Sequence, residues 1–161
     1  DAGNTVTLAG YLNLLGDSGL VTGLQKFSMD VARKRASIPK YQVFNNALLS
    51  VQSGLTFTEA IADGKRWGQI FESAIGAHIV SEAFVHRFEV YYWRDGNDEV
   101  DFILKKNKKI VALEVKSNGE SQTTGMERFC KLFHPTASFI VGENGIKPEV
   151  FLGMDLRQLF A

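Results

Sequence analysis

The clearest pattern of apolar and polar positions in the chain lies between residues 65 and 83. Apolar side chains recur there at intervals of three and four residues, which places them on one face of an amphipathic helix. We therefore predict a helix over residues 65–83 that covers a hydrophobic core. The stripe consists of Trp67, Ile70, Phe71, Ala74, Ile75, His78 and Ile79.

Strand-like and helical patterns follow this helix in a regular order. Three apolar, β-branched segments are separated by short turns rich in Gly, Asn and Lys, which predicts two hairpins. A second amphipathic helix and another strand come next, so the predicted order is α-β-β-β-α-β. A last strand near Val150 and a short helix complete the chain. The predicted strands span residues 88–94, 98–104, 108–116 and 137–141, and the later helices span residues 124–133 and 154–160.

The first fifty residues have a different pattern. A helix over residues 7–15, a strand over 20–27, a basic loop over 28–39 and a strand over 41–44 have the order of the back half of a winged helix. A short helix over residues 47–51 ends this part. We predict a partial winged-helix region over residues 1–50, a linker over 51–64 and the main domain over 65–161.

Acidic residues interrupt the second and third strands of the main domain. Side chains alternate between the two faces of a strand, so Asp101 and Glu114 are expected on one face with Lys116. Two carboxylates and an ammonium group on a rigid sheet could hold a divalent cation and activate a water against a phosphodiester. The expected site face carries Glu99, Asp101, Ile103, Ala112, Glu114 and Lys116, and the expected core face carries Val100, Phe102, Leu104, Val111, Leu113 and Val115.

A simpler interpretation of the same residues is a solvated sheet face with a cross-strand salt bridge, worth about 0.5 kcal/mol. Periodicity alone favours this interpretation over a catalytic one.

Composition narrows the class of protein. The 161 residues include 18 basic and 18 acidic ones, so any contact with nucleic acid must be local. The single cysteine, Cys130, forms no intramolecular disulfide and is expected to pack in a helix. No segment has the length of a membrane span, so we expect a cytoplasmic location and no membrane partner. The chain begins without Met, which indicates a fragment of a longer protein.

The order of elements and three short motifs resemble a known group of proteins. An α-β-β-β-α-β core with an Asp in its second strand and Glu-x-Lys in its third resembles the restriction-endonuclease-like, or PD-(D/E)xK, superfamily. Over about residues 10–145 the chain is similar to the C-terminal domain of unknown function of prokaryotic AAA+ ATPases. The motifs are Tyr92-Trp93-Arg94, Glu99-Val100-Asp101-Phe102 and Glu114-Val115-Lys116-Ser117.

The resemblance implies an α/β fold, with a mixed sheet flanked by helices and preceded by a winged-helix remnant. It also implies roles for individual residues. Asp101 and Glu114 would bind Mg²⁺ or Mn²⁺ with help from the Val115 carbonyl, and Lys116 would orient the attacking water. Glu72, at the edge of the first helix's buried face, would be a further ligand and catalytic residue. Val100 departs from the superfamily pattern, which has Pro before the Asp.

Partners follow from the same resemblance. The chain has no P-loop motif, so ATP would bind only in an upstream ATPase domain of the parent protein. A homo-oligomer is possible. Basic residues that could contact a DNA backbone also suit a soluble surface. They are Lys105, Lys106 and Lys108 in the second turn, and Arg33, Lys34, Arg35 and Lys40 in the expected wing.

Two functional hypotheses therefore stand. The first is a metal-dependent nuclease that hydrolyses DNA phosphodiesters. The second is a catalytically silent module with the same fold, which binds DNA or protein or assembles the ATPase. Neutral net charge favours the second, and the complete Asp and Glu-x-Lys set favours the first.

Overall fold

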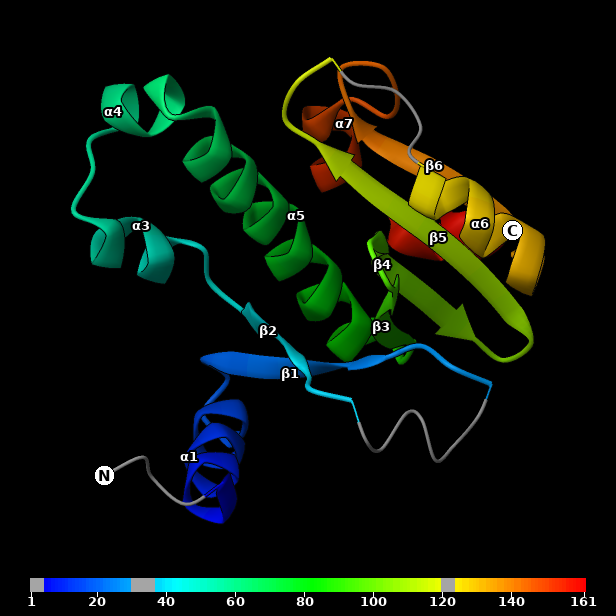
Figure 1. Cartoon of the computed structure of the whole chain (residues 1–161), viewed down its shortest axis with the longest axis horizontal. Helices are drawn as coiled ribbons and strands as arrows, with labels where there is room; N and C mark the ends of the chain where they lie inside the picture. The colour runs from blue at the N-terminus through cyan, green and yellow to red at the C-terminus, as the bar shows by residue number, and fades with distance from the viewer. Residues whose placement is uncertain (1–4, 30–36, 120–123) are drawn as a thin grey trace.

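A computed structural model describes residues 5–29, 37–119 and 124–161. Three helices in a row separate the first two strands of the chain from the later ones (Figure 1). None of the helices in these three ranges is long and apolar enough to cross a membrane. The elements are α1 (Thr5–Asp17), β1 (Val21–Lys26), β2 (Lys40–Val43), α3 (Ala47–Ser53), α4 (Phe57–Ala62), α5 (Gly64–His86), β3 (Glu89–Asp95), β4 (Asp98–Lys106), β5 (Lys109–Lys116), α6 (Thr124–Phe133), β6 (Ala137–Gly142), α7 (Pro148–Gly153) and the 3₁₀ helix η1 (Leu156–Phe160).

The strands form one mixed sheet of six, in the order β2-β1-β3-β4-β5-β6. β3, β4 and β5 pair antiparallel through two hairpins, as predicted, whereas β6 pairs parallel to β5 after the α6 crossover. The predicted order α-β-β-β-α-β is confirmed in the run from α5 to β6. The chain is thus an α/β protein with helices flanking a mixed sheet.

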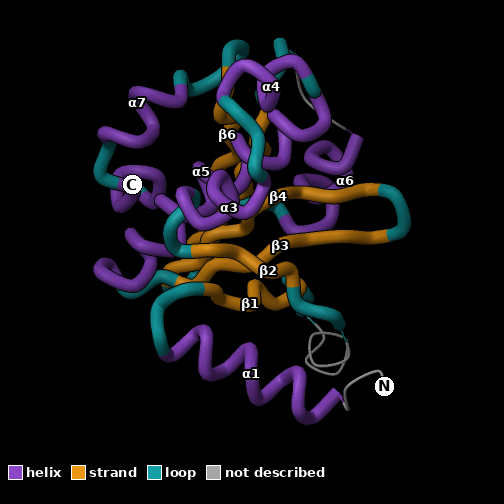
Figure 2. Tube along the Cα trace, turned by 90° about the vertical axis from the view of Figure 1, so that its left-hand side faces the viewer, coloured by secondary structure: helices purple, strands orange, loops and turns teal. Residues whose placement is uncertain are grey.

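The N-terminal elements extend this sheet. The predicted helix, strand and returning strand are confirmed as α1, β1 and β2. Because β1 pairs in parallel with β3, through Gln25 and Tyr91, the sheet runs across the predicted boundary between the winged-helix region and the main domain. Figure 2 shows α1 beside β1, away from α3 and α4. Arg33, Lys34 and Arg35 lie outside the described residues.

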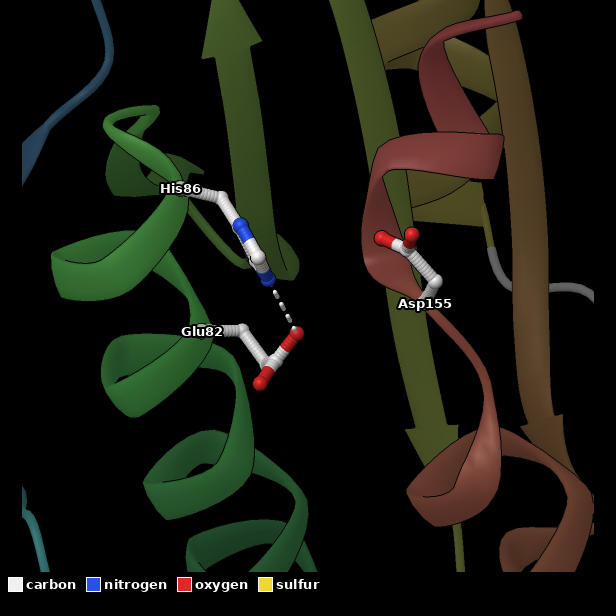
Figure 3. Close-up of side chains that lie close together, drawn as sticks. All are labelled: Glu82, His86 and Asp155. Atoms are coloured by element: carbon white, nitrogen blue, oxygen red, sulfur yellow. Dashed lines mark ion pairs between the residues drawn. The ribbon is translucent and has the colours of Figure 1, made fainter.

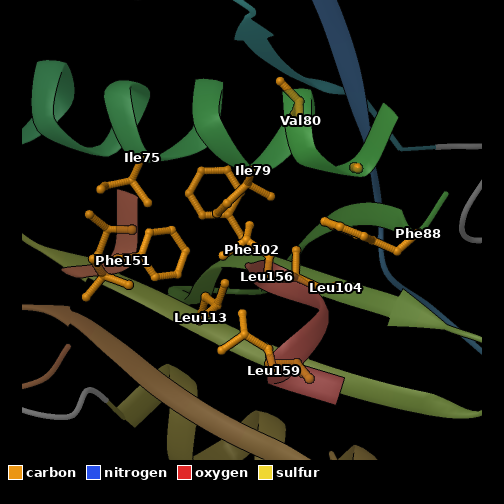
Figure 4. Close-up of a cluster of buried hydrophobic side chains, with 14 of the residues drawn as sticks. Ile75, Ile79, Val80, Phe88, Phe102, Leu104, Leu113, Phe151, Leu156 and Leu159 are labelled. Atoms are coloured by element: carbon orange, nitrogen blue, oxygen red, sulfur yellow. The ribbon is translucent and has the colours of Figure 1, made fainter. Parts of the chain in front are cut away.

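Two hydrophobic layers cover the two faces of the sheet. On one face, Ile75 and Ile79 of α5 pack against Phe102 of β4 and Leu113 of β5, together with Phe151 of α7 (Figure 4). These five side chains are at most 1% exposed. Ile75 and Ile79 of the predicted stripe are thus confirmed as core, whereas its other members are only partly buried. The opposite face of the sheet packs against α6, mainly through Trp93, Ile103, Ala112, Met126 and Phe129.

A β-bulge in β4 changes the expected alternation. The pairing with β3 shifts from Tyr91 opposite Ile103 to Trp93 opposite Val100, so β4 carries one extra residue at this point. Val100 therefore packs in the α6 layer, and its predicted place beside Phe102 and Leu104 was wrong. The extra residue falls at Asp101 and Phe102, where the site was expected. Ile103 and Ala112, which were expected on the site face, pack in the α6 layer, whereas Asp101 lies near Lys40 of β2 and Glu72 of α5. The prediction of one common site face was therefore wrong.

Residues 51–64, predicted as a linker, contain the helix α4, which begins with a capping box in which the Thr56 and Glu59 side chains satisfy each other's backbone N–H groups. One local prediction was wrong: the predicted strand near Val150 is the helix α7. Pro148 at its first turn supplies a helical φ angle and needs no hydrogen-bond partner for its nitrogen. The short helix over residues 154–160 is confirmed as η1.

Candidate functional site

Asp101 lies where β4 and β5 separate. The backbone pairing of the two strands runs as far as Phe102 opposite Leu113. Beyond it, the Asp101 carboxylate takes over the acceptor role, because its Oδ2 accepts a hydrogen bond of 2.8 Å from the Val115 N–H. The bulge thus directs an acidic side chain into the gap between two strands, where it is only 8% exposed.

Glu114 and Lys116 follow on β5, two residues apart and therefore on one side of the strand. Leu113 and Val115 pack in the α5 layer, so Glu114 and Lys116 project from the opposite side of β5, the side of Ala112. Glu114 is 4% exposed. Its Oε1 lies 3.0 Å from the Lys116 ammonium, so the two side chains form an ion pair within β5. Its Oε2 is buried and has no hydrogen-bond partner among the described residues. A buried carboxylate oxygen without a donor is costly, and such an atom suits a ligand of positive charge.

Lys40 brings a second ammonium group into the acidic cluster. Its Nζ, on the first residue of β2, lies 2.5 Å from Glu72 Oε1, 3.6 Å from Glu99 Oε1 and 3.8 Å from Asp101 Oδ1. It also lies 5.4 Å from the centre of the Phe102 ring. The structure thus connects Glu72 with Asp101, as predicted, but it does so through a lysine that sequence analysis had placed in the wing.

The electrostatics of this cluster favour a bound cation. Burial, followed by the negative charge of Glu72, raises the pKa of Asp101 to about 7, although Lys40 and the Val115 N–H oppose the rise. Burial opposes the charge on Lys40, but the carboxylates of Glu72, Asp101 and Glu99 together raise its pKa above the ordinary value. Lys40 therefore stays protonated, and the acids compete for too little positive charge.

The donor set fits Mg²⁺ or Mn²⁺ better than zinc, because the acidic groups that act on Asp101 in the described part of the chain, Glu72 and Glu114, offer carboxylate oxygens. Glu114 contributes an oxygen that lacks a donor. Glu72, Asp101 and Glu114 do not, however, form a group whose ligand atoms all lie within 4.8 Å of one another in the described part of the chain. Instead, the Lys40 ammonium group lies between Glu72 and Asp101 in this structure.

One group of described residues does meet that distance, at the other end of α5. It consists of Glu82, His86 and Asp155 (Figure 3). His86 Nε2 lies 3.2 Å from Glu82 Oε2, and Asp155 is engaged by the Arg157 guanidinium at 2.6 Å. Two ion pairs, Glu82 with His86 on α5 and Asp155 with Arg157 at η1, thus lie next to each other here. This group was not predicted from the sequence, although the spacing of four residues between Glu82 and His86 places both on one helix face.

Comparison with protein families gives a match over residues 67–149, to a family described as Domain of unknown function (DUF4143). The chain belongs to this family. The matched range contains Glu72, Asp101, Glu114 and Lys116, whereas Lys40 precedes it. No curated protein and no solved structure was found to match the chain.

The basic turn of the DUF4143 domain lies away from the acidic cluster. Lys106 is five residues from Asp101 along β4, which corresponds to about 16 Å. Its Nζ donates to the His86 carbonyl oxygen at 3.3 Å, and the Lys105 ammonium lies 3.5 Å from Glu89. Lys108 is exposed in the turn. The structure therefore does not bring these predicted nucleic-acid contacts together with the predicted metal ligands.

Proposed function

We propose that this DUF4143 domain is a restriction-endonuclease-like nuclease that needs a divalent cation to hydrolyse DNA phosphodiesters. One observation carries the proposal: two acidic side chains, Asp101 and Glu114, are buried on neighbouring strands, and one Glu114 oxygen has no donor among the described residues. The order of elements from α5 to β6 agrees with the order expected for this class.

Burial of these acids needs a reason beyond stability. Removing a carboxylate from water costs free energy unless it is paired and hydrogen-bonded. Asp101 has one backbone donor at 2.8 Å and a lysine at 3.8 Å, which is little compensation for a group that is almost fully buried. Groups held in such unfavourable protonation environments concentrate at functional sites.

Each residue has a definite task in this proposal. Asp101 and Glu114 would hold the cation, which when bound lowers the pKa of water and offsets charge on phosphoryl oxygens. Glu72 would join them as a third oxygen donor. The Lys116 ammonium, 3.0 Å from Glu114, would orient the attacking water and stabilise the negative charge that develops on the phosphate.

A second candidate function is a catalytically silent module that uses the same fold to bind DNA or protein. The ion pairs of Lys40 favour it, because a protein that keeps a lysine 2.5 Å from Glu72 has partly neutralised its acidic cluster without a metal. In that case the site is a structural remnant and the cluster only connects β2 with α5.

Cleavage of plasmid and branched DNA, with Mg²⁺ or Mn²⁺ and with EDTA, distinguishes the two functions. We expect metal-dependent cleavage by the wild-type chain and a loss of at least about a hundredfold in the Asp101→Asn and Lys116→Ala variants. Glu127→Gln is the matched control, because Glu127 is an exposed acid on α6.

The variants also identify a contaminating nuclease. Equal cleavage by wild type, Asp101→Asn and Lys116→Ala would show that the activity does not belong to this chain. No cleavage by wild type under any of these conditions, with the folded state verified by circular dichroism, would favour the silent module.

A further inference from the structure

Lys40 occupies a position that a cation would need in the proposed nuclease. It lies between Glu72 and Asp101, two of the three acids assigned to the metal. Its Nζ is buried from solvent, so the charge is not a loosely placed surface group. An ammonium group and a divalent cation only a few ångströms apart repel each other strongly where solvent screening is weak.

The packing of β2 against α5 holds Lys40 in this place. Gln42, two residues further along β2, is 5% exposed, and its side-chain amide donates to the Ser73 carbonyl oxygen at 2.9 Å. The approach is close because α5 has a glycine here: a Cβ on Gly76 would overlap the Gln42 side chain. Lys40 points to the same side of β2 as Gln42, and it meets Glu72, the neighbour of Ser73.

The geometry points to Lys40 as a built-in counter-ion that competes with the divalent cation for Glu72 and Asp101. This inference rests on the proposed function and adds its regulation. Lys40 must withdraw before the cation can bind both acids, so it lowers the affinity of the site for metal. The four-carbon stem of lysine permits withdrawal without movement of β2.

Binding of Mn²⁺, measured by titration calorimetry, tests the inference. We expect the Lys40→Met variant to bind Mn²⁺ at least about tenfold more tightly than wild type, because a nearby positive charge is gone. Lys131→Met is the matched control, since Lys131 is an exposed lysine on α6, and its affinity should equal that of wild type. Unchanged or weaker binding by Lys40→Met would overturn the inference.

Two further measurements test the inference if the Lys40→Met variant does not fold. Lys40→Gln keeps a donor for Glu72 without the charge and should show the same gain in affinity. In the wild-type chain, titration with Mg²⁺ should shift the NMR signal of the Lys40 ammonium toward that of an exposed lysine. A signal that stays unchanged at saturating Mg²⁺ would contradict the competition.

The outcomes separate this inference from the nuclease proposal. Tighter Mn²⁺ binding by Lys40→Met without DNA cleavage by any variant would refute the nuclease and leave the counter-ion role intact. Metal-dependent cleavage by wild type, together with an unchanged Mn²⁺ affinity of Lys40→Met, would support the nuclease and refute the counter-ion role. If neither chain binds Mn²⁺, both ideas are wrong.

Discussion

Replacement of Asp101 by Asn should stabilise the fold at neutral pH. Asn has the same shape, and its side-chain oxygen can still accept the hydrogen bond from Val115. It cannot carry the negative charge that burial and Glu72 make unfavourable. Acidic residues at functional sites are often retained at a cost in stability, and this variant measures that cost.

The magnitude follows from the pKa of Asp101. A carboxyl whose pKa rises from 3.8 to about 7 on folding binds its proton more tightly in the folded state. Its ionisation therefore destabilises the fold, and the loss develops as the pH rises from about 4 to about 7. The full difference corresponds to about 4 kcal/mol. Local relaxation around the charge reduces it, so we expect a gain of about 2 kcal/mol or more for Asp101→Asn at pH 7.5.

Urea denaturation of both chains in EDTA, at pH 4, 6 and 7.5, provides the measurement. The stability difference should be largest at pH 7.5 and fall toward zero at pH 4. The other titrating groups are common to the two chains, so the difference reports the charge of Asp101 together with its effect on the neighbouring charges of Glu72 and Lys40. A variant less stable than wild type at pH 7.5, or a difference that does not vary with pH, would refute the reasoning.

Three further substitutions test the packing that positions the site. Gly76→Ala should cost about 1 to 3 kcal/mol in thermal unfolding, because its Cβ overlaps Gln42; a neutral effect would disprove the close approach. Phe129→Ala, at a fully buried position, should cost about 3 to 5 kcal/mol, whereas Leu132→Ala, at a position 55% exposed, should cost far less. Thr56→Ala should cost about 1 kcal/mol through loss of the cap of α4, and equal denaturation midpoints would argue against that cap.

The elements of the sheet could be predicted because their patterns are local. The stripe from Trp67 to Ile79 and the alternation in residues 108–116 each depend on one element and its burial. The pairing of Glu114 with Lys116 follows from their spacing on one strand. Sequence periodicity therefore sufficed where a side chain's position depends on its own helix or strand.

Features that depend on contacts between distant segments could not be predicted in this way. Nothing near Asp101 in the sequence marks the bulge, which arises from pairing with β3. Lys40 looks like any other basic residue of the wing, and only the packing of β2 on α5 brings it to Glu72. The apolar run around Val150 fits a strand or a short helix equally well, and Pro148 was the available signal for the helix.

The same reasoning applies to the candidate metal ligands. The sequence predicted Asp101 and Glu114 on neighbouring strands and on one face of the sheet. Both side chains are buried, but the bulge at Asp101 breaks the alternation from which the common face was predicted. The sequence could not predict how the charge of the cluster is balanced, because that depends on a lysine 61 residues before Asp101 in the sequence.

A crystal grown with Mn²⁺ and measured for anomalous scattering tests the central claim most directly. We expect an anomalous peak within coordination distance of the Asp101 and Glu114 carboxylates, with the Lys40 ammonium turned away from Glu72. Two results would contradict this expectation. One is unchanged density for Lys40 with no anomalous peak at Asp101, and the other is a peak found only at Glu82, His86 and Asp155.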